Sequence, residues 1–395
     1  MDITLSSLET EHTGLLHQKI GAEIASQNGS IPFSRYMEMA LYEPGMGYYS
    51  AGAHKLGAGG DFTTAPELTP LFGATIAATL LPVLEALKAQ GLPTQILEFG
   101  AGTGKLAQSI IERLHDLDFH LDHYRIIEIS PDLAQRQQAR LNALTAQLHL
   151  TTECEWLSSM PTPFKGIIIA NEVIDAIPCD LIMHQQGFWY WRDVTLEDNR
   201  LTWKIGAPVD QDLLPEALTT GTFSEGYITE LHTQANAWIA HIAQAMELGL
   251  FLTVDYGFPE SEYYHPQRTD GTLIAHHRHH AIQDPFYLPG LSDITTHVEW
   301  SQIARAALRE NADDVYLTNQ AAYLLDAGIG EIALEIGNPS DPATFLPISN
   351  ALQKLLSEAE MGELFKVFAF SKHLEQLLPN HSLEDLPGLR GRNRL

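Results

Sequence analysis

The strongest indication of the fold in this 395-residue chain is the segment Glu98-Phe99-Gly100-Ala101-Gly102-Thr103-Gly104. It joins a short strand-like segment at residues 95–99 to a segment at residues 105–114 that has the apolar spacing of a helix. Glycines at such a junction allow a tight turn and let a ligand approach the backbone closely. The dinucleotide-binding pattern would place a glycine where Lys105 stands, so the turn predicts a different ligand.

Strands and helices alternate after Thr94. Further strands are predicted at residues 123–129, 148–156, 166–170, 250–256 and 364–370, and residues 223–246 predict mainly a helix. The run Ile167-Ile168-Ile169 is apolar without interruption, as in strands that are buried on both faces. The pattern predicts a doubly wound parallel α/β sheet within residues 91–395, with insertions at about 181–222 and 257–300. Residues 1–90 predict an N-terminal helical and lid region.

The composition limits the class of partner. The chain carries 50 acidic and 23 basic residues, which gives a formal net charge of −27. This charge argues against nucleic acid as the main partner, because phosphate contacts need lysine and arginine. It suits a basic protein substrate through long-range attraction, although an acidic surface can also serve only solubility.

The sequence also suggests a cellular compartment. Two cysteines, Cys154 and Cys179, are too few for a disulfide framework or a four-cysteine zinc site. The first residues lack the basic and apolar regions of a signal peptide and the arginines of a transit peptide. The uncharged run at residues 68–84 contains two prolines and predicts a buried helix rather than a membrane span. We therefore expect a cytoplasmic protein with no membrane insertion.

Two carboxylates lie at the ends of predicted strands. Glu98 precedes the first glycine by two residues and could receive a cationic amino group, which suits a ligand with an amino-acid tail. Glu128 ends the second predicted strand, where carboxylates of doubly wound folds accept hydrogen bonds from ribose hydroxyls. Trp156 could stack on an adenine ring or belong to the core.

The segment Asn171-Glu172-Val173-Ile174-Asp175 follows the fourth predicted strand, and we expect it to face the reacting centre. Glu172 and Asp175 could clamp a guanidinium group by bidentate hydrogen bonds. They could also act as a general base or cap the following helix.

Three other segments are considered as a lid, a metal site and a partner surface. The stretch Asp61-Phe62-Thr63-Thr64 follows a glycine-rich loop and could fold over the site as a lid, or could only cap a helix. We expect no metal at His276-His277-Arg278-His279-His280, because consecutive side chains point in different directions. The residues Phe188-Trp189-Tyr190-Trp191 could form a dimer or partner surface, or a strand hairpin packed on the core.

Together, the glycine turn, Glu128 and the apolar fourth strand resemble a class I S-adenosylmethionine-dependent methyltransferase. A more specific resemblance, to the MidA family, covers nearly the whole chain. It rests on a set of separate motifs in the right order: residues 33–37, 41–44, 47–49, 60–67, 171–178, 255–257, 271–273 and 361–367.

The resemblance implies a seven-stranded, Rossmann-like methyltransferase core with a helical N-terminal extension and insertions. It implies S-adenosylmethionine as cofactor and, because the family includes a mitochondrial arginine methyltransferase that assists complex I assembly, an arginine of a protein substrate. Two alternatives stay open, namely methylation of a small molecule or another side chain, and a non-enzymatic assembly factor that retains the fold. Cofactor contacts are expected at Glu98, Gly100, Gly102, Gly104, Glu128 and Asn171, and catalytic roles at Asp61, Glu172 and Asp175.

Overall fold

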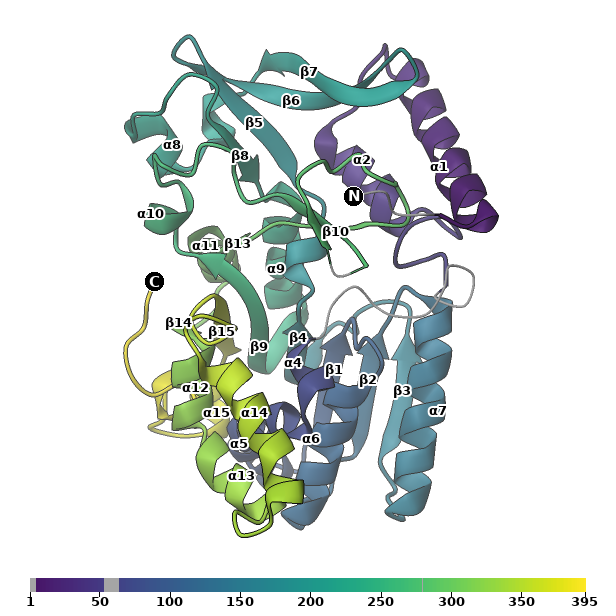
Figure 1. The fold of residues 1–395 in the computed structure, drawn as a ribbon. Coiled ribbons are helices and arrows are strands. Elements are labelled where there is room, and N and C mark those ends of the chain that lie inside the picture. The colour runs from purple at the N-terminus through teal and green to yellow at the C-terminus, as the bar shows by residue number, and fades with distance from the viewer. Residues whose placement is uncertain (1–4, 53–63, 279) are drawn as a thin grey trace.

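The computed structural model describes residues 5–52, 64–278 and 280–395, and its main sheet forms the lower half of the molecule in Figure 1. The strands follow the order β14-β15-β9-β4-β1-β2-β3, and β13 pairs with β9. Neighbours from β9 to β3 run parallel, whereas β15 is antiparallel to β9 and β14. The strands are β1 (Gln95–Phe99), β2 (His123–Ile127), β3 (Glu153–Leu157), β4 (Phe164–Asn171), β9 (Met246–Phe258), β13 (Val298–Glu299), β14 (Val315–Asn319) and β15 (Phe365–Lys372).

Apolar side chains on both faces of the sheet explain the helical layer on each side. Ile167 and Ile169 of β4 face one layer, whereas Ile168 between them faces the other. The first layer contains α5 (Pro70–Ala89), α6 (Lys105–Asp116), α7 (Pro131–Gln147), α12 (Gln320–Asp326), α13 (Ile329–Ile336), α14 (Pro342–Leu356) and α15 (Leu374–Leu377). The second layer contains α9 (Thr233–Ala245) and α11 (Trp300–Arg309).

A second lobe, made largely of antiparallel strands, lies beyond the carboxyl end of β4 (Figure 1). Residues 223–246 were predicted to be mainly helical, but Ile228–Leu231 form a strand because they pair with Asp180–Met183. Two sheets have the orders β7-β6-β5-β8 and β11-β10-β12. The lobe contains α1 (Ser7–Ser26), α2 (Phe33–Tyr42), β5 (Asp180–Gln185), β6 (Phe188–Glu197), β7 (Arg200–Pro208), α8 (Glu216–Thr220), β8 (Ile228–Leu231), α10 (Glu260–Tyr263), β10 (Ile274–His277), β11 (His280–Ile282) and β12 (Asp293–Thr295).

Two motifs from the sequence belong to this lobe. Residues 188–191 lie in the β5–β6 hairpin, where Trp189 is buried and Phe188 is exposed. His277 ends β10 and His280 begins β11. Among the residues that the structure describes, no group of three or more histidine, cysteine, aspartate or glutamate side chains could hold a metal ion.

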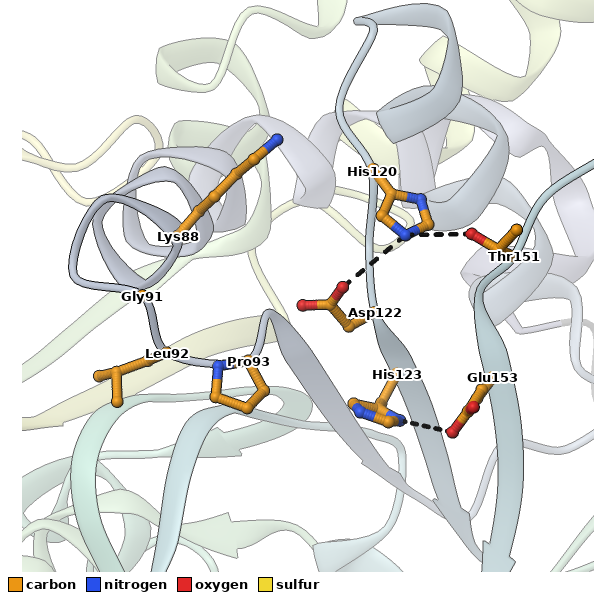
Figure 2. A pocket seen from close by; sticks show the side chains of 9 residues that line it. All are labelled: Lys88, Gly91, Leu92, Pro93, His120, Asp122, His123, Thr151 and Glu153. Carbon is orange, nitrogen blue, oxygen red and sulfur yellow. Dashed lines mark hydrogen bonds and ion pairs between the residues drawn. The ribbon is translucent and has the colours of Figure 1, made fainter.

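The amino ends of β1, β2 and β3 face away from the second lobe and border a polar surface cavity of about 610 Å³ (Figure 2). His120 Nε2 lies 3.7 Å from Asp122 Oδ1, and His123 Nδ1 lies 3.3 Å from Glu153 Oε2. The cavity is lined by Lys88, Gly91, Leu92, Pro93, His120, Asp122, His123, Thr151 and Glu153. None of these residues carries a predicted catalytic or cofactor-binding role, so the cavity is separate from the candidate site.

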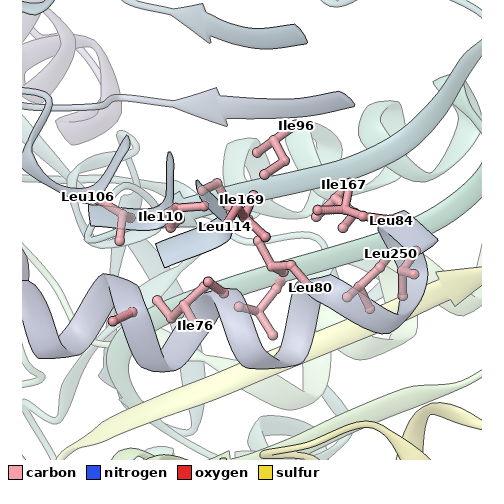
Figure 3. Packing of buried hydrophobic residues seen from close by; sticks show 14 of the residues in the cluster. Ile76, Leu80, Leu84, Ile96, Leu106, Ile110, Leu114, Ile167, Ile169 and Leu250 are labelled. Atoms are coloured by element: carbon pink, nitrogen blue, oxygen red, sulfur yellow. The ribbon is translucent and has the colours of Figure 1, made fainter. Parts of the chain in front are cut away.

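Helix α5 belongs to the first helical layer and contributes many of the buried apolar residues there (Figure 3). Ile76, Leu80 and Leu84 of this helix belong to one buried cluster with Ile167 and Leu250 of the sheet, and Leu84 lies near both of these sheet residues (Figure 3). The helix is long and apolar enough to cross a membrane, but 72% of its most apolar window is buried inside the protein. Packing against the sheet therefore accounts for its apolar composition.

Candidate active site

The glycine turn lies between β1 and α6, at the carboxyl end of the first strand. Gly100, Gly102 and Gly104 have φ values of 61°, 52° and 81°, which residues with a Cβ atom adopt only with strain. Among the residues that the structure describes, a Cβ atom added to Gly102 would meet no atom within 4 Å. The turn therefore leaves open space beside its backbone, as a closely bound ligand requires.

Glu98 lies two residues before the turn and is buried. The hydroxyl of Tyr124 in β2 donates a hydrogen bond to Glu98 Oε2 at 2.7 Å. Burial raises the pKa of Glu98 to about 8, and the bond from Tyr124 only partly opposes this rise. A cationic amino group beside this carboxyl would favour its ionised form, so Glu98 fits the role of an ammonium partner.

Glu128 directly follows β2, and its two carboxylate oxygens have different donors. The Ser130 N–H donates to Oε1 at 2.9 Å, and the Gln137 amide donates to Oε2 at 2.9 Å. Burial raises the pKa of Glu128, while both of these bonds act to lower it. Each carboxylate oxygen keeps a second lone pair, so Glu128 can still accept hydrogen bonds from ligand hydroxyls.

The short helix α4 (Ala65–Leu68) is anchored to the glycine turn. Thr103 Oγ1 donates to Glu67 Oε1, and Lys105 Nζ lies 2.7 Å from Glu67 Oε2. Asp61, which was expected in a lid, lies outside the described residues. The contacts of Glu67 hold helix α4 beside the glycine turn.

The carboxyl end of β4 places Asn171 and Glu172 at the edge of the main sheet where the glycine turn also lies. A Cβ atom added to Gly100 would lie 3.0 Å from Val173 Cγ2, so this segment contacts the glycine turn. Glu172 has a φ of 52°, a strained conformation for a residue other than glycine. Its side chain accepts a hydrogen bond from Asn171 Nδ2 at 3.2 Å. Burial, reinforced by the charge of Asp175, raises the pKa of Glu172 to about 8.

Asp175 lies in the 3₁₀ turn Ile174–Ala176 and is also buried. The Tyr256 hydroxyl donates to its Oδ2 at 2.6 Å. The other oxygen, Oδ1, is buried and has no hydrogen-bond partner in the described part of the chain. Burial raises the pKa of Asp175 even though Tyr256 stabilises the charged form.

Asp255 supports this turn from β9. Its Oδ2 accepts hydrogen bonds from the Ile174 and Asp175 N–H groups at 2.9 and 3.1 Å, and its Oδ1 accepts from the Tyr256 N–H at 2.9 Å. Burial, with the charges of Asp175 and Glu172, raises the pKa of Asp255 well above its ordinary range. Asp255 therefore fixes the backbone that presents Asp175.

The N-terminal segment that carries Tyr42 and Tyr49 contacts the residues after β4 and strand β12. The Tyr42 hydroxyl donates to the Ala176 carbonyl at 2.7 Å, and the Tyr42 ring stacks on Tyr49 with centroids 5.5 Å apart. The Tyr49 hydroxyl lies 2.9 and 3.0 Å from the two oxygens of Asp293 in β12. Residues more than a hundred positions apart in sequence thus meet at the carboxyl edge of the main sheet.

Several of these residues were not among the predicted site residues. Asp255 and Tyr256 follow the same rule that singled out Glu128, since they lie near the carboxyl end of a central strand. Gln137 and Asp293 give no such signal, because one lies in the middle of a helix and the other in an insertion. Only the packing of distant segments brings them to the site.

This chain is similar to a methyltransferase family and to two solved structures. Residues 75–317 match a family model described as S-adenosyl-L-methionine-dependent methyltransferase. A Burkholderia thailandensis crystal structure bound to S-adenosyl-homocysteine is 42% identical, with a TM-score of 0.86 over 99% of this chain and 96% of that chain. A native crystal structure from the same bacterium is also 42% identical, with a TM-score of 0.87 over 99% and 98% of the two chains. These matches confirm the predicted class I methyltransferase fold.

A curated relative from Danio rerio is named protein arginine methyltransferase NDUFAF7, mitochondrial. It is 27% identical over 86% of this chain and 83% of the relative. The expectation of a cytoplasmic protein is wrong in the light of such relatives, because they are named as mitochondrial proteins. Its basis, the composition of the first residues, is a weaker guide than similarity along most of the chain.

Proposed function

Because the chain belongs to the family of S-adenosyl-L-methionine-dependent methyltransferases, we propose that it methylates an arginine side chain of a protein substrate. Its cofactor is S-adenosylmethionine. The name of the Danio rerio relative supports arginine as the acceptor, and the net charge of −27 suits a basic segment of a protein. A respiratory complex I subunit, which the resemblance to the MidA family implies, is the first substrate to test. A homodimer is the first assembly to test, with the exposed Phe188 as a contact residue.

The main support for the proposal is the group of buried carboxylates at the carboxyl ends of β4 and β9. Glu172, Asp175 and Asp255 all have raised pKa values, and the charge of one raises the pKa of another. Asp175 Oδ1 still lacks a donor among the described residues. A guanidinium group carries a positive charge and five N–H donors in one plane, so it would satisfy both the charge and the unpartnered acceptor.

The residues divide into a cofactor side and an acceptor side. Glu98 would hold the amino group of the cofactor, the glycine turn would accommodate its amino-acid part, and Glu128 and Asn171 would bind near its sugar. S-adenosylmethionine, when bound, supplies an electrophilic methyl group. Glu172 and Asp175 would orient the guanidinium and take up the proton that the methylated nitrogen loses. Asp61 is the third proposed catalytic residue and would act from a lid over the site.

The experiment that tests the function is transfer of a labelled methyl group. The protein is incubated with methyl-labelled S-adenosylmethionine and a lysate from cells that lack its gene, and labelled proteins are hydrolysed. We expect labelled methylarginine from one protein band. Label on another side chain or on a small metabolite would retain the methyltransferase and reject arginine as acceptor. A complex I subunit carrying the label would identify the substrate.

The pH dependence of the reaction tests the acceptor side. Tyr256→Phe removes the donor to Asp175 Oδ2, so the pKa of Asp175 should rise further. A carboxyl with a higher pKa is protonated at higher pH, so the acidic limb of the kcat/KM profile should move upward. One charge-assisted hydrogen bond contributes about 1.5 kcal/mol, which corresponds to a shift of about one pH unit. Tyr190→Phe in β6 is the control, and an identical profile for both variants would reject the role of Asp175.

A further inference from the structure

Gln137 joins three segments of the proposed cofactor site. It lies within α7 and its side chain is fully buried. Its Nε2 donates hydrogen bonds to the Gly102 carbonyl at 2.8 Å and to Glu128 Oε2 at 2.9 Å. Its Oε1 accepts a hydrogen bond from Trp156 Nε1 at 2.9 Å. One side chain thus contacts the glycine turn, the acid after β2 and the end of β3.

The hydrogen-bonding partners fix the orientation of this amide. An indole N–H can only donate, so the atom of Gln137 that faces Trp156 must be the oxygen. The amide nitrogen then faces Gly102 and Glu128, and both of its hydrogens are used. Arg140, one turn later in α7, adds a bond from its Nε to the Thr103 carbonyl at 2.8 Å.

We propose that Gln137 is a positioning residue for the cofactor, because it holds the Gly102 backbone and the Glu128 carboxylate in a fixed relation. The two groups come from loops after different strands, and each would contact a different part of the cofactor. Fixing them before binding lowers the entropic cost of association. The inference rests on the proposed placement of the cofactor at the glycine turn and is independent of the methyl acceptor.

Calorimetric titration with S-adenosylhomocysteine tests this inference without any acceptor. Gln137→Leu keeps the approximate size of the side chain and removes both donors. We expect its Kd to be about ten- to thirty-fold higher, as expected for loss of a buried bond to a charged group. The exposed neighbour offers a matched control, and Gln138→Leu should bind as the unmodified protein does.

A second variant guards against loss of folding. Gln137→Glu retains an acceptor for Trp156 but places a carboxylate beside Glu128 and Gly102 O. We expect the same loss of affinity, measured below the melting temperature of the variant, because a carboxyl group has at most one donor and cannot replace both hydrogen bonds that the amide donates. If Gln137 only filled space in the core, this variant would bind the ligand normally once folded.

The pH dependence of Kd separates positioning from packing. The Gln137 bond lowers the pKa of Glu128, so Glu128 in Gln137→Leu should become protonated at a higher pH. Affinity in this variant should therefore begin to fall at a higher pH as the solution is acidified. Glu98 and Tyr42 also interact with Glu128, and both remain in every variant.

Two outcomes would overturn the inference for different reasons. A folded Gln137→Leu variant with unchanged Kd and pH profile would reject the positioning role. Unchanged affinity in Gly102→Val would instead reject the placement of the cofactor at the turn, on which the inference depends. Neither result would bear on whether arginine is the acceptor.

Discussion

Glu172→Gln is expected to lower kcat for methyl transfer by about 10²- to 10⁴-fold, the range for loss of a group that takes part in proton transfer. Glutamine has nearly the same shape, so the strained backbone at φ 52° and the bond from the Glu172 N–H to the Val254 carbonyl can persist. What the substitution removes is the negative charge that would hold the guanidinium. Single-turnover rates with labelled cofactor would measure the loss.

The affinity for S-adenosylhomocysteine should not change in this variant. Glu197→Gln, at the exposed end of β6, provides a control for the change of charge. If Glu172→Gln lost cofactor binding instead, Glu172 would belong to the cofactor side of the site. Wild-type kcat in Glu172→Gln would leave it without a chemical role.

Gly102→Val is expected to reduce cofactor affinity by more than about 100-fold, because loss of the space beside the turn costs more than about 2.8 kcal/mol. Gly102 has a φ of 52°, and no atom of the described part of the chain lies within 4 Å of its added Cβ. A valine side chain would project into space that the proposed cofactor needs. Calorimetry with S-adenosylhomocysteine would show the loss directly.

Backbone strain must be separated from this steric effect. A left-handed conformation costs a residue with a side chain roughly 1–2 kcal/mol, so Gly102→Val should also lower the melting temperature. Gly187→Val offers a matched control, since Gly187 has a φ of 82° and an added Cβ there would meet no atom within 4 Å in residues 5–52, 64–278 and 280–395. That variant should be destabilised to a similar degree and bind the ligand normally. Equal binding by both variants would contradict the assignment of the turn.

The α/β fold could be predicted because its signals are local. Residues 95–114 carry the strand, the turn and the helix in one continuous segment. The apolar run of β4 requires burial on both faces, which indicated helices on both sides of the sheet. Ile228–Leu231 were missed because their strand depends on pairing with β5, which lies more than forty residues away.

The candidate site likewise contains residues that the sequence could identify and residues that it could not. Glu98, Glu128, Glu172 and Asp175 could be selected because they lie near the carboxyl ends of strands, and these ends share one edge of the sheet. Their chemical roles stay predictions, as does the division of the chain near residue 90. Asp255 and Gln137 act on the site through hydrogen bonds to the backbone of other segments. No pattern of residue types along the chain encodes such contacts.

The alternation of strands and helices in the α/β core, the glycine turn and the carboxylates near it could be derived from the sequence, since each depends on neighbouring residues and on periodic burial. The set of polar groups that meet follows from the packing of the folded chain. This packing brought Tyr49 to Asp293, Tyr256 to Asp175, and Gln137 to Gly102 and Glu128. Hydrogen bonds and the pKa effects of burial act over a few ångströms in space. Strand register and helix packing set those distances, and separation along the chain does not.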